Sequence, residues 1–115
     1  MITIYGIKNC DTMKKTFDWM ENQKVKYQFH NYKTEGLTIL KINEWLTRVT
    51  ISELINQKGT TFRNLTEIQK KKILTTKTAA EIILLNPSVI KRPLIEWKEK
   101  LFIGFSPAIW HFGKQ

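Results

Sequence analysis

The alternation of hydrophobic and polar residues at the start of the chain predicts a strand, a helix and a second strand. Residues 2–5 (ITIY) are β-branched or aromatic, and Gly6 interrupts this run. From Asp11 or Thr12, either of which can cap a helix, apolar residues recur every three or four positions. Residues 25–32 (VKYQFHNY) then alternate between apolar and polar. A crossover of this length makes the two strands parallel neighbours.

The middle of the chain, residues 38–86, has the apolar spacing of helices. We expect four helices here, each beginning at a hydroxyl residue that can cap its first turn: Thr38, Ser52, Thr66 and Thr78. After Thr66 and Thr78 an amide or acidic residue follows three positions later, which completes a capping box. Gly59 is expected to end the second helix, and the pair at residues 86–87 (NP) the fourth.

The last part of the chain returns to strands. Residues 94–97 (LIEW) and 100–105 (KLFIGF) predict an antiparallel hairpin around a tight turn. Ser106, with a proline after it, predicts a last helix that runs to the C-terminus. Together with the parallel pair, the hairpin gives a mixed four-stranded sheet with helices on its faces, which is an α/β fold. We expect a single domain over residues 1–115, in which residues 38–86 form a helical insert.

The composition indicates a cytoplasmic globular protein. Of the 115 residues, 42% are hydrophobic, which is enough for a packed core. No apolar run approaches the roughly 18 residues of a membrane span, and the first residues lack the basic and apolar regions of a signal peptide. A single cysteine excludes an internal disulfide, a Cys-x-x-Cys pair and a thiolate zinc cage. His30 and His111 stand apart from other ligand residues, so we expect no metal site.

The formal net charge of +9 favours an anionic partner, which can be a nucleic acid, an acidic protein or an anionic small molecule. The lysines are spread along the chain, and the one dense run, residues 70–72, lies in an expected helix. The chain has no basic motif that is interleaved with aromatic residues. The pattern therefore argues against nucleic acid as the partner.

The lone cysteine, Cys10, follows the first expected strand and stands where the first helix begins. A helix N-terminus offers free N–H groups and partial positive charge, and Lys8 and Lys14 add cationic charge nearby. Such surroundings lower a cysteine pKa from about 8.5 into the range of roughly 3.5–7.5, and they also hold an oxyanion. The site would then suit nucleophilic attack on an anionic or sulfur substrate. The alternative is a small buried hydrophobic residue, and these observations leave both interpretations open.

Several motifs resemble those of a known family. They are YGIKNCDTMKK at residues 5–15, KGTTFR at 58–63, NPSVIKRPL at 86–94 and IGF at 103–105. In this order they are similar to the glutaredoxin-type arsenate reductase (ArsC)/Spx-like family, and most of all to its small single-cysteine YffB-type branch. The resemblance spans nearly the whole chain. It implies a thioredoxin-like fold, β-α-β followed by β-β-α, with a helical insert.

The resemblance also implies roles for individual residues. Cys10 corresponds to the nucleophile of the family. Arg63 and Arg92 correspond to two arginines that hold the oxyanion near this cysteine in the arsenate reductases, where their planar fork suits an anion. Pro93 corresponds to a proline preceded by a cis peptide bond. The residues that flank the thiol are expected to help bind or orient an anionic substrate: Lys8, Asn9, Thr12 and Lys14.

The chain departs from the family's pattern in three places. Lys14 stands where the arsenate reductases have an arginine four residues after the cysteine. Around the last hairpin, where they have a third arginine, this chain has Lys98 and Lys100, so that role is empty or passes to a lysine. Met13 stands where Spx-like regulators carry the second cysteine of a redox switch. The first two departures disfavour arsenate as the substrate, and the third excludes an intramolecular disulfide switch.

We therefore expect a thiol-dependent reductase in which the Cys10 thiolate attacks a disulfide or an oxyanion. The covalent product needs a second thiol, which this chain lacks, so an external thiol is required. Glutathione is the expected co-substrate, with no cofactor bound, and its carboxylates would be attracted to a basic pocket. Arsenate, a glutathione mixed disulfide and a protein disulfide remain open as substrates. The alternative is a non-catalytic Spx-like regulatory protein that contacts RNA polymerase or another partner.

Overall fold

The computed structural model describes residues 1–112, which form two compact units. The sheet unit comprises residues 1–35 and the chain from Arg92 onward, and the helical unit comprises residues 36–91. The expected insert, residues 38–86, falls inside the helical unit. That the chain forms a single domain stays a prediction. Within the described part of the chain, no helix has the length and apolar composition needed to cross a membrane.

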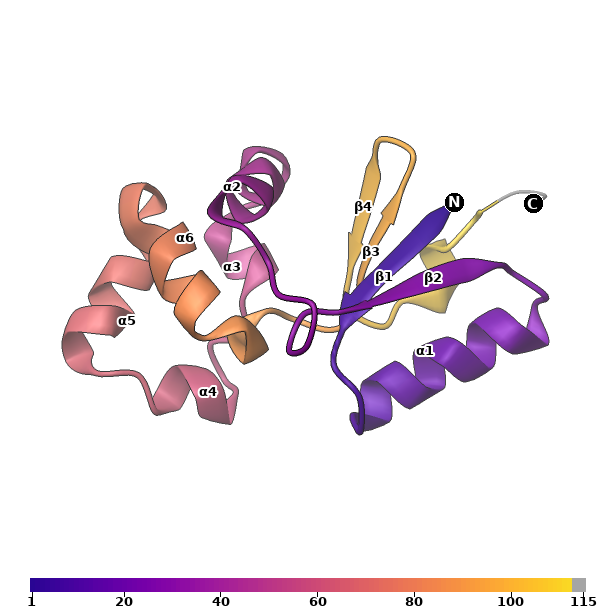
Figure 1. Ribbon diagram of the computed structural model, residues 1–115, viewed down its shortest axis with the longest axis horizontal. Coiled ribbons are helices and arrows are strands. Elements are labelled where there is room, and N and C mark those ends of the chain that lie inside the picture. The colour runs from indigo at the N-terminus through magenta and orange to yellow at the C-terminus, as the bar shows by residue number, and fades with distance from the viewer. Residues whose placement is uncertain (113–115) are drawn as a thin grey trace. The chain divides into compact units, whose positions relative to one another are not determined.

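The sheet unit contains four strands in the spatial order β2-β1-β3-β4 (Figure 1). Their bounds are Ile2–Gly6 for β1, Tyr27–Asn31 for β2, Leu94–Trp97 for β3 and Lys100–Ile103 for β4. β1 pairs with β2 in parallel, and β3 pairs antiparallel with both β1 and β4. This mixed sheet confirms the α/β fold that the sequence predicts.

Helix α1, Asp11–Asn22, connects β1 to β2 and packs on one face of the sheet (Figure 1). Alternate side chains of the strands point to that face of the sheet, and every third or fourth side chain of the helix points toward the sheet. The buried core that results consists of Ile2, Ile4, Met13, Met20, Ile95, Trp110 and Phe112. Because Met13 belongs to this core, the first turn of α1 is anchored to the sheet just after Cys10.

The expectation of a last helix that runs to the C-terminus is wrong for the described residues. Only a short 3-10 turn forms, η2, which spans Pro107–Ile109 and follows Ser106. Trp110 and Phe112 then both enter the core and are each 3% exposed. Side chains two positions apart point to different sides of a helix, so burial of both rings disfavours a helix at this end of the chain. Residues 113–115, which the expected helix also covered, lie outside the described residues.

The helical unit is built from five α-helices and a 3-10 turn. Their bounds are Ile39–Arg48 for α2, Ile51–Leu54 for α3, Thr60–Arg63 for α4, Glu67–Ile73 for α5, Thr76–Leu85 for α6 and Pro87–Val89 for the 3-10 turn η1. The Thr38 hydroxyl caps α2 by accepting a hydrogen bond from the Lys41 N–H. Thr66 and Gln69 form the expected capping box at the start of α5. Two of the predicted caps are therefore confirmed.

The other two expected helix starts are wrong, and the first of them concerns α3. This helix is capped by Thr50, whose hydroxyl accepts a hydrogen bond from the Glu53 N–H. The Glu53 carboxylate accepts in return from the Thr50 N–H, which completes the capping box. Ser52 cannot form such a box because the apolar Ile55 stands three positions later.

Helix α6, expected to begin at Thr78, instead begins at Thr76 with Thr75 as its N-cap residue. The Thr78 hydroxyl donates a 2.6 Å hydrogen bond to the carbonyl oxygen of Lys72. That carbonyl belongs to the last turn of α5, where carbonyl groups lack partners inside the helix. Gly59, expected to end a helix, instead precedes α4, whose four residues are too few to give a periodic pattern in the sequence.

Candidate active site

Cys10 stands at the junction between β1 and α1. After β1, Asn9 turns the chain with a positive φ of 58°, a conformation that asparagine tolerates better than most residues. Cys10 is then extended (φ −121°, ψ 127°) and is the N-cap residue of α1. Its carbonyl oxygen accepts a 2.9 Å hydrogen bond from the Lys14 N–H. The expectation that Asp11 or Thr12 caps this helix is wrong, because both already lie inside it.

Gly6 allows α1 to pack closely against the end of β1. A Cβ atom at this position would lie 2.5 Å from both the Sδ and the Cε atoms of Met13. Met13 is 1% exposed, so its side chain has little room to move aside. The glycine therefore holds the first turn of α1, and the thiol that precedes it, close to the sheet.

The Cys10 thiol is half-buried, and its surroundings favour the thiolate. Burial by itself raises the pKa of Cys10. The Met13 N–H, the Arg92 side chain and the Thr12 N–H, together with the positive charge of the arginine, favour the charged form, outweigh burial and lower this pKa below its usual value. The two N–H groups belong to the first turn of α1, where backbone donors have no partner inside the helix.

The cationic partner of the thiol is Arg92. It lies in the segment that immediately precedes β3, and its peptide bond to Pro93 is cis. The guanidinium is half-buried and interacts with both Tyr32 and Cys10. Burial by itself lowers the pKa of Arg92, but its interactions with Tyr32 and then with Cys10 raise that pKa above the usual value. The guanidinium therefore stays charged beside the thiol.

Tyr32 is a site residue that the sequence analysis missed. It directly follows β2, is 2% exposed, and its N–H donates a 3.1 Å hydrogen bond to the carbonyl oxygen of Gly6. Burial raises the pKa of Tyr32; Arg92 acts in the opposite direction, and Cys10 raises it further. The predicted parallel pair of strands could have indicated Tyr32. The carboxyl ends of parallel neighbours meet at one edge of the sheet, so the residue after the second strand lies near the residues after the first.

A cavity of about 370 Å³ opens beside the thiol and is bounded by residues 8–11, Met13, Lys14 and Phe17. Its volume lies within the range of roughly 300–1,000 Å³ that is typical of small-molecule sites. The lysines and an exposed aspartate, Asp11, give it charged borders, whereas Met13 and Phe17 give it an apolar wall. A group bonded to the sulfur that Cys10 attacks can therefore be accommodated next to the thiol.

All the site residues that the sequence analysis named, except Arg63, belong to the sheet unit. Arg92 and the Thr12 N–H both lower the pKa of the thiol. The flanking residues that line the cavity beside the thiol are Lys8, Asn9 and Lys14. Arg63 is the last residue of α4 in the helical unit, where it is exposed and donates a 3.3 Å hydrogen bond to the Thr60 hydroxyl. Its role in anion binding stays a prediction.

Lys98 and Lys100 are not placed to take the role of a third anion-binding arginine. β3 runs antiparallel to β1, with Leu94 opposite Tyr5. Because the thiol follows the end of β1, the turn after β3 lies at the opposite end of the sheet. There the Nζ atoms of Lys98 and Lys100 lie 4.7 and 5.5 Å from the centroid of the Trp97 ring, within the range of cation–π contacts.

Residues 5–111 match the model of the ArsC family. The chain belongs to this family. Its structure is similar to that of a protein named YffB, with a TM-score of 0.88 and 41% identity over 94% of each chain. It is also similar to the solution structure of an arsenate reductase (ArsC) related protein from Brucella melitensis, with a TM-score of 0.76 and 46% identity over 93% of this chain and 88% of the other. These likenesses confirm the thioredoxin-like ArsC fold and the resemblance to the YffB-type branch.

Relatives of this ArsC-family chain include both an uncharacterised protein and regulators. The uncharacterised protein, from Haemophilus influenzae, is 41% identical over 106 residues, which cover 92% of each chain. The global transcriptional regulator Spx of Listeria innocua is 28% identical over 108 residues, which cover 92% of this chain and 81% of Spx. Family membership therefore admits a reductase and a regulator, and the choice between them depends on the site.

Proposed function

We propose that this ArsC-family protein is a glutathione-dependent reductase whose nucleophile is the Cys10 thiolate. The supporting observation is the arrangement at the start of α1, where two N–H groups and one arginine lower the pKa of a half-buried thiol. A lowered pKa gives more of the reactive thiolate near neutral pH. A structural cysteine that only fills space needs no such partners.

The reaction takes place by two thiol–disulfide exchanges. First, the Cys10 thiolate attacks the glutathione sulfur of a mixed disulfide, R–S–S–G; the bond between the substrate sulfurs breaks, and R–S⁻ leaves and takes a proton from water. Second, the thiolate of free glutathione attacks the glutathione sulfur that is bound to Cys10. This step forms oxidised glutathione and restores the Cys10 thiolate. One substrate disulfide is reduced, and one glutathione disulfide is formed.

The residues at the site favour a disulfide over arsenate as the substrate. A tetrahedral oxyanion is best held by several arginine forks, and in the sheet unit Arg92 is the arginine at the thiol. Lys14 replaces an arginine of the arsenate reductases, and the lysines of the hairpin lie at the other end of the sheet. A disulfide needs less positive charge, because the negative charge in its transition state is spread over sulfur atoms.

The test of this proposal is turnover of the mixed disulfide of glutathione and 2-mercaptoethanol, coupled to glutathione reductase and NADPH. We expect steady NADPH oxidation that requires both free glutathione and this protein. With arsenate in place of the disulfide, we expect a much lower rate. If the rate with the disulfide does not exceed that of uncatalysed exchange, the reductase proposal is wrong.

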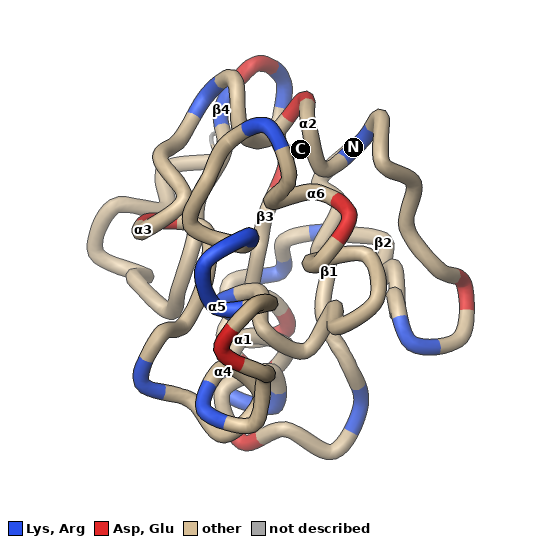
Figure 2. Tube along the Cα trace, turned by 90° about the vertical axis from the view of Figure 1, so that its left-hand side faces the viewer, with Lys and Arg blue, Asp and Glu red and all other residues tan. Residues whose placement is uncertain are grey.

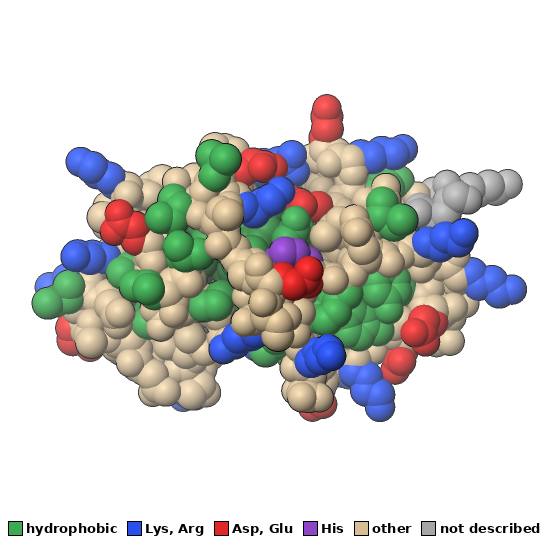
Figure 3. Space-filling model, viewed as in Figure 1, with side chains coloured by type: hydrophobic (Ala, Val, Ile, Leu, Met, Phe, Trp, Pro, Cys, Tyr) green, Lys and Arg blue, Asp and Glu red, His purple; other side chains and the backbone are tan. Residues whose placement is uncertain are grey.

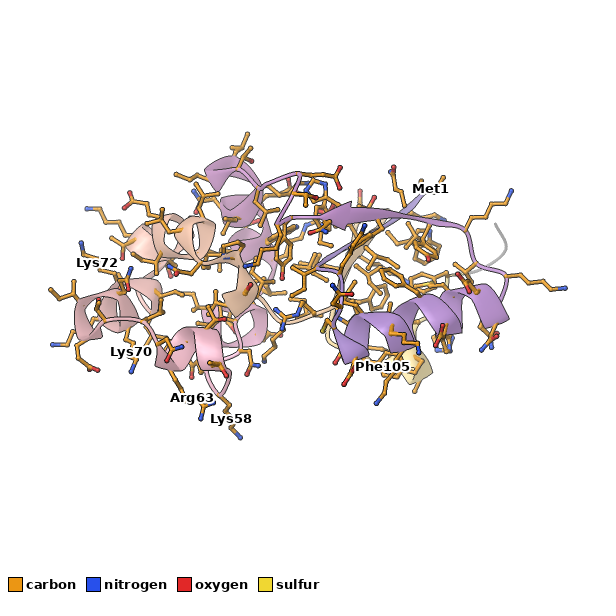
Figure 4. The ribbon with its side chains drawn as sticks, turned by 60° about the horizontal axis from the view of Figure 1, so that its bottom comes forward. Met1, Lys58, Arg63, Lys70, Lys72 and Phe105 are labelled. Carbon is orange, nitrogen blue, oxygen red and sulfur yellow. The ribbon has the colours of Figure 1, made fainter. Side chains whose placement is uncertain are left out.

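Regulatory binding is a second candidate function, and the distribution of charge in the helical unit favours it. One segment, residues 58–77, contains a single acidic residue, Glu67, and six cationic ones: Lys58, Arg63, Lys70, Lys71, Lys72 and Lys77. Elsewhere in the helical unit three cationic residues are balanced by three acidic ones: Lys41, Arg48 and Lys91 against Glu44, Glu53 and Glu81. Figure 2 shows the lysine run along α5, and Figure 4 shows Lys58 and Arg63 pointing outward. Such a segment suits an acidic protein surface.

The two candidates are separated by binding to purified RNA polymerase. If the second holds, replacing residues 70–72 with glutamine weakens binding about tenfold at low salt. Replacing Lys24, Lys26 and Lys33, which are exposed lysines of the sheet unit, removes the same charge and leaves binding unchanged. Absence of binding by the wild-type protein would eliminate this candidate.

A further inference from the structure

The cavity beside Cys10 continues into a partly exposed aromatic surface between α1 and β2. Phe17 lines the cavity, and its ring centroid lies 5.6 Å from that of Tyr27 in a stacked arrangement and 5.0 Å from that of Phe29 in an edge-on one. None of the three rings is fully buried. Figure 3 shows hydrophobic side chains gathered over this part of the sheet unit. We call Phe17, Tyr27 and Phe29 the aromatic surface.

The charges around this surface differ between its two ends. Close to the thiol, the exposed Lys8 and Lys14 border the cavity together with one carboxylate, that of Asp11, so the cationic groups outnumber the acidic one. At the other end, burial raises the pKa of Tyr27, and the nearby carboxylates of Glu21 and Asp18 raise it further. The surface is therefore complementary to a ligand that carries a carboxylate near the reacting sulfur and an apolar group farther away.

The chemistry at Cys10 restricts what can occupy this surface. The R group is joined to the attacked glutathione sulfur through one further sulfur atom. Its nearest parts must therefore lie close to the cavity beside Cys10. An oxyanion has no apolar surface to place against Phe17. Glutathione itself carries carboxylates and no apolar side chain. An apolar wall that adjoins the thiol fits a polypeptide, whose neighbouring side chains extend away from its cysteine.

We infer that the substrate is a glutathionylated polypeptide that places an apolar side chain on Phe17 and an acidic side chain beside Lys8 and Lys14. This inference rests on the proposed reductase function and specifies its R group. Cys10 attacks the glutathione sulfur, and the polypeptide leaves as its thiolate, as in the exchange described above. The aromatic surface determines which polypeptides are reduced.

The experiment uses two synthetic peptides that carry the same glutathionylated cysteine. One peptide has leucine and glutamate close to the cysteine, and the other has glycine and glutamine at the same positions. Burial of one side chain in an apolar site discriminates about tenfold. We expect the wild-type protein to reduce the leucine–glutamate peptide with a kcat/KM about tenfold higher than that of the glycine–glutamine peptide.

Two pairs of matched variants assign this preference to the surface. Phe17→Ala is expected to lower the ratio of the two kcat/KM values to the part that glutamate contributes, whereas Phe102→Ala preserves the full ratio. Phe102 is also half-buried and packs against the same core, but it lies on β4. Lys14→Gln lowers the preference for glutamate, and Lys15→Gln, on the same helix but outside the cavity, does not. The lysine pair keeps the test valid if Phe17→Ala does not fold.

Each outcome decides the inference. Equal kcat/KM values for the two peptides in the wild-type protein would overturn it, as would a preference that all four variants change alike. If the small 2-mercaptoethanol disulfide is reduced but neither peptide is, the inference is wrong and the reductase function stands. If none of the three is reduced, the reductase function is wrong as well. The inference is supported if the wild-type protein prefers the leucine–glutamate peptide, Phe17→Ala or Lys14→Gln reduces this preference, and the controls Phe102→Ala and Lys15→Gln keep it.

Discussion

Replacing Cys10 with serine is expected to abolish turnover of the mixed disulfide and to lower kcat/KM by at least about 1,000-fold. A hydroxyl group cannot form a disulfide with glutathione, and Cys10 is the only thiol of the chain. The measurement is the NADPH-coupled rate at saturating glutathione, with the rate of uncatalysed exchange subtracted.

The serine variant should keep its fold, which makes the result interpretable. Cys10 is the N-cap residue of α1, and serine is among the residues preferred at that position. We therefore expect an unchanged circular dichroism spectrum and a free energy of unfolding within about 1 kcal/mol of the wild-type value, because the gain from a serine cap offsets the lost stabilisation of the thiolate. Turnover above about 1% of the wild-type rate in a folded Cys10→Ser protein would contradict the mechanism.

Replacing Arg92 with glutamine is expected to raise the pKa of Cys10 and to lower kcat/KM at pH 7 by about 10- to 100-fold. The change removes a hydrogen bond and a positive charge that lower this pKa in the wild-type protein. Each unit of pKa corresponds to a tenfold change, or about 1.4 kcal/mol, in the preference for the thiolate. Because the thiolate is lost as pH falls through the pKa, a higher pKa moves the rise of kcat/KM to higher pH. The pH dependence of kcat/KM measures this shift.

Two further variants serve as controls for Arg92→Gln. One removes an arginine charge elsewhere in the protein, and the other keeps the charge at position 92 but removes the planar guanidinium group. Arg48 lies in α2, where its Nη2 atom is 3.7 Å from the Glu44 carboxylate, and surface pairs of this kind contribute little. Arg48→Gln should therefore leave kcat/KM and its pH profile unchanged. Arg92→Lys keeps the charge but loses the planar fork, so its effect should be intermediate. A wild-type pH profile in Arg92→Gln would show that another group lowers the pKa of Cys10.

Much of the fold could be predicted from local patterns, because they act over a few residues. The β-branched run at residues 2–5 and the helical period after it fixed the order of the first elements. Capping was predicted correctly at Thr38 and Thr66. The prediction failed at Thr78, whose hydroxyl instead donates a hydrogen bond to the carbonyl oxygen of Lys72. It also failed where neighbouring hydroxyl residues compete: Thr50 has a glutamate three positions later and Ser52 has not. The C-terminal helix failed because burial of two rings two positions apart overrides local propensity.

The site was only partly predictable, because its residues come from distant parts of the chain. Cys10 could be singled out from its place between a strand and a helix, and Arg92 from the family resemblance. Tyr32 joins them through the register of the parallel strands, which the sequence alone does not specify. The hairpin lysines were candidates because they are close in sequence to the family's third arginine. The antiparallel register of β3 places them at the other end of the sheet.

The central claim is that the start of α1 and Arg92 hold Cys10 as a thiolate, and the rate of its alkylation tests this claim most directly. Because Cys10 is the only cysteine, the rate of reaction with iodoacetamide between about pH 4 and pH 10 reports on one thiol. Its lowered pKa predicts a rate that reaches half its maximum below the ordinary value of about 8.5. A half-point at or above about 8.5 would contradict the claim, and regulatory binding would then become the leading function.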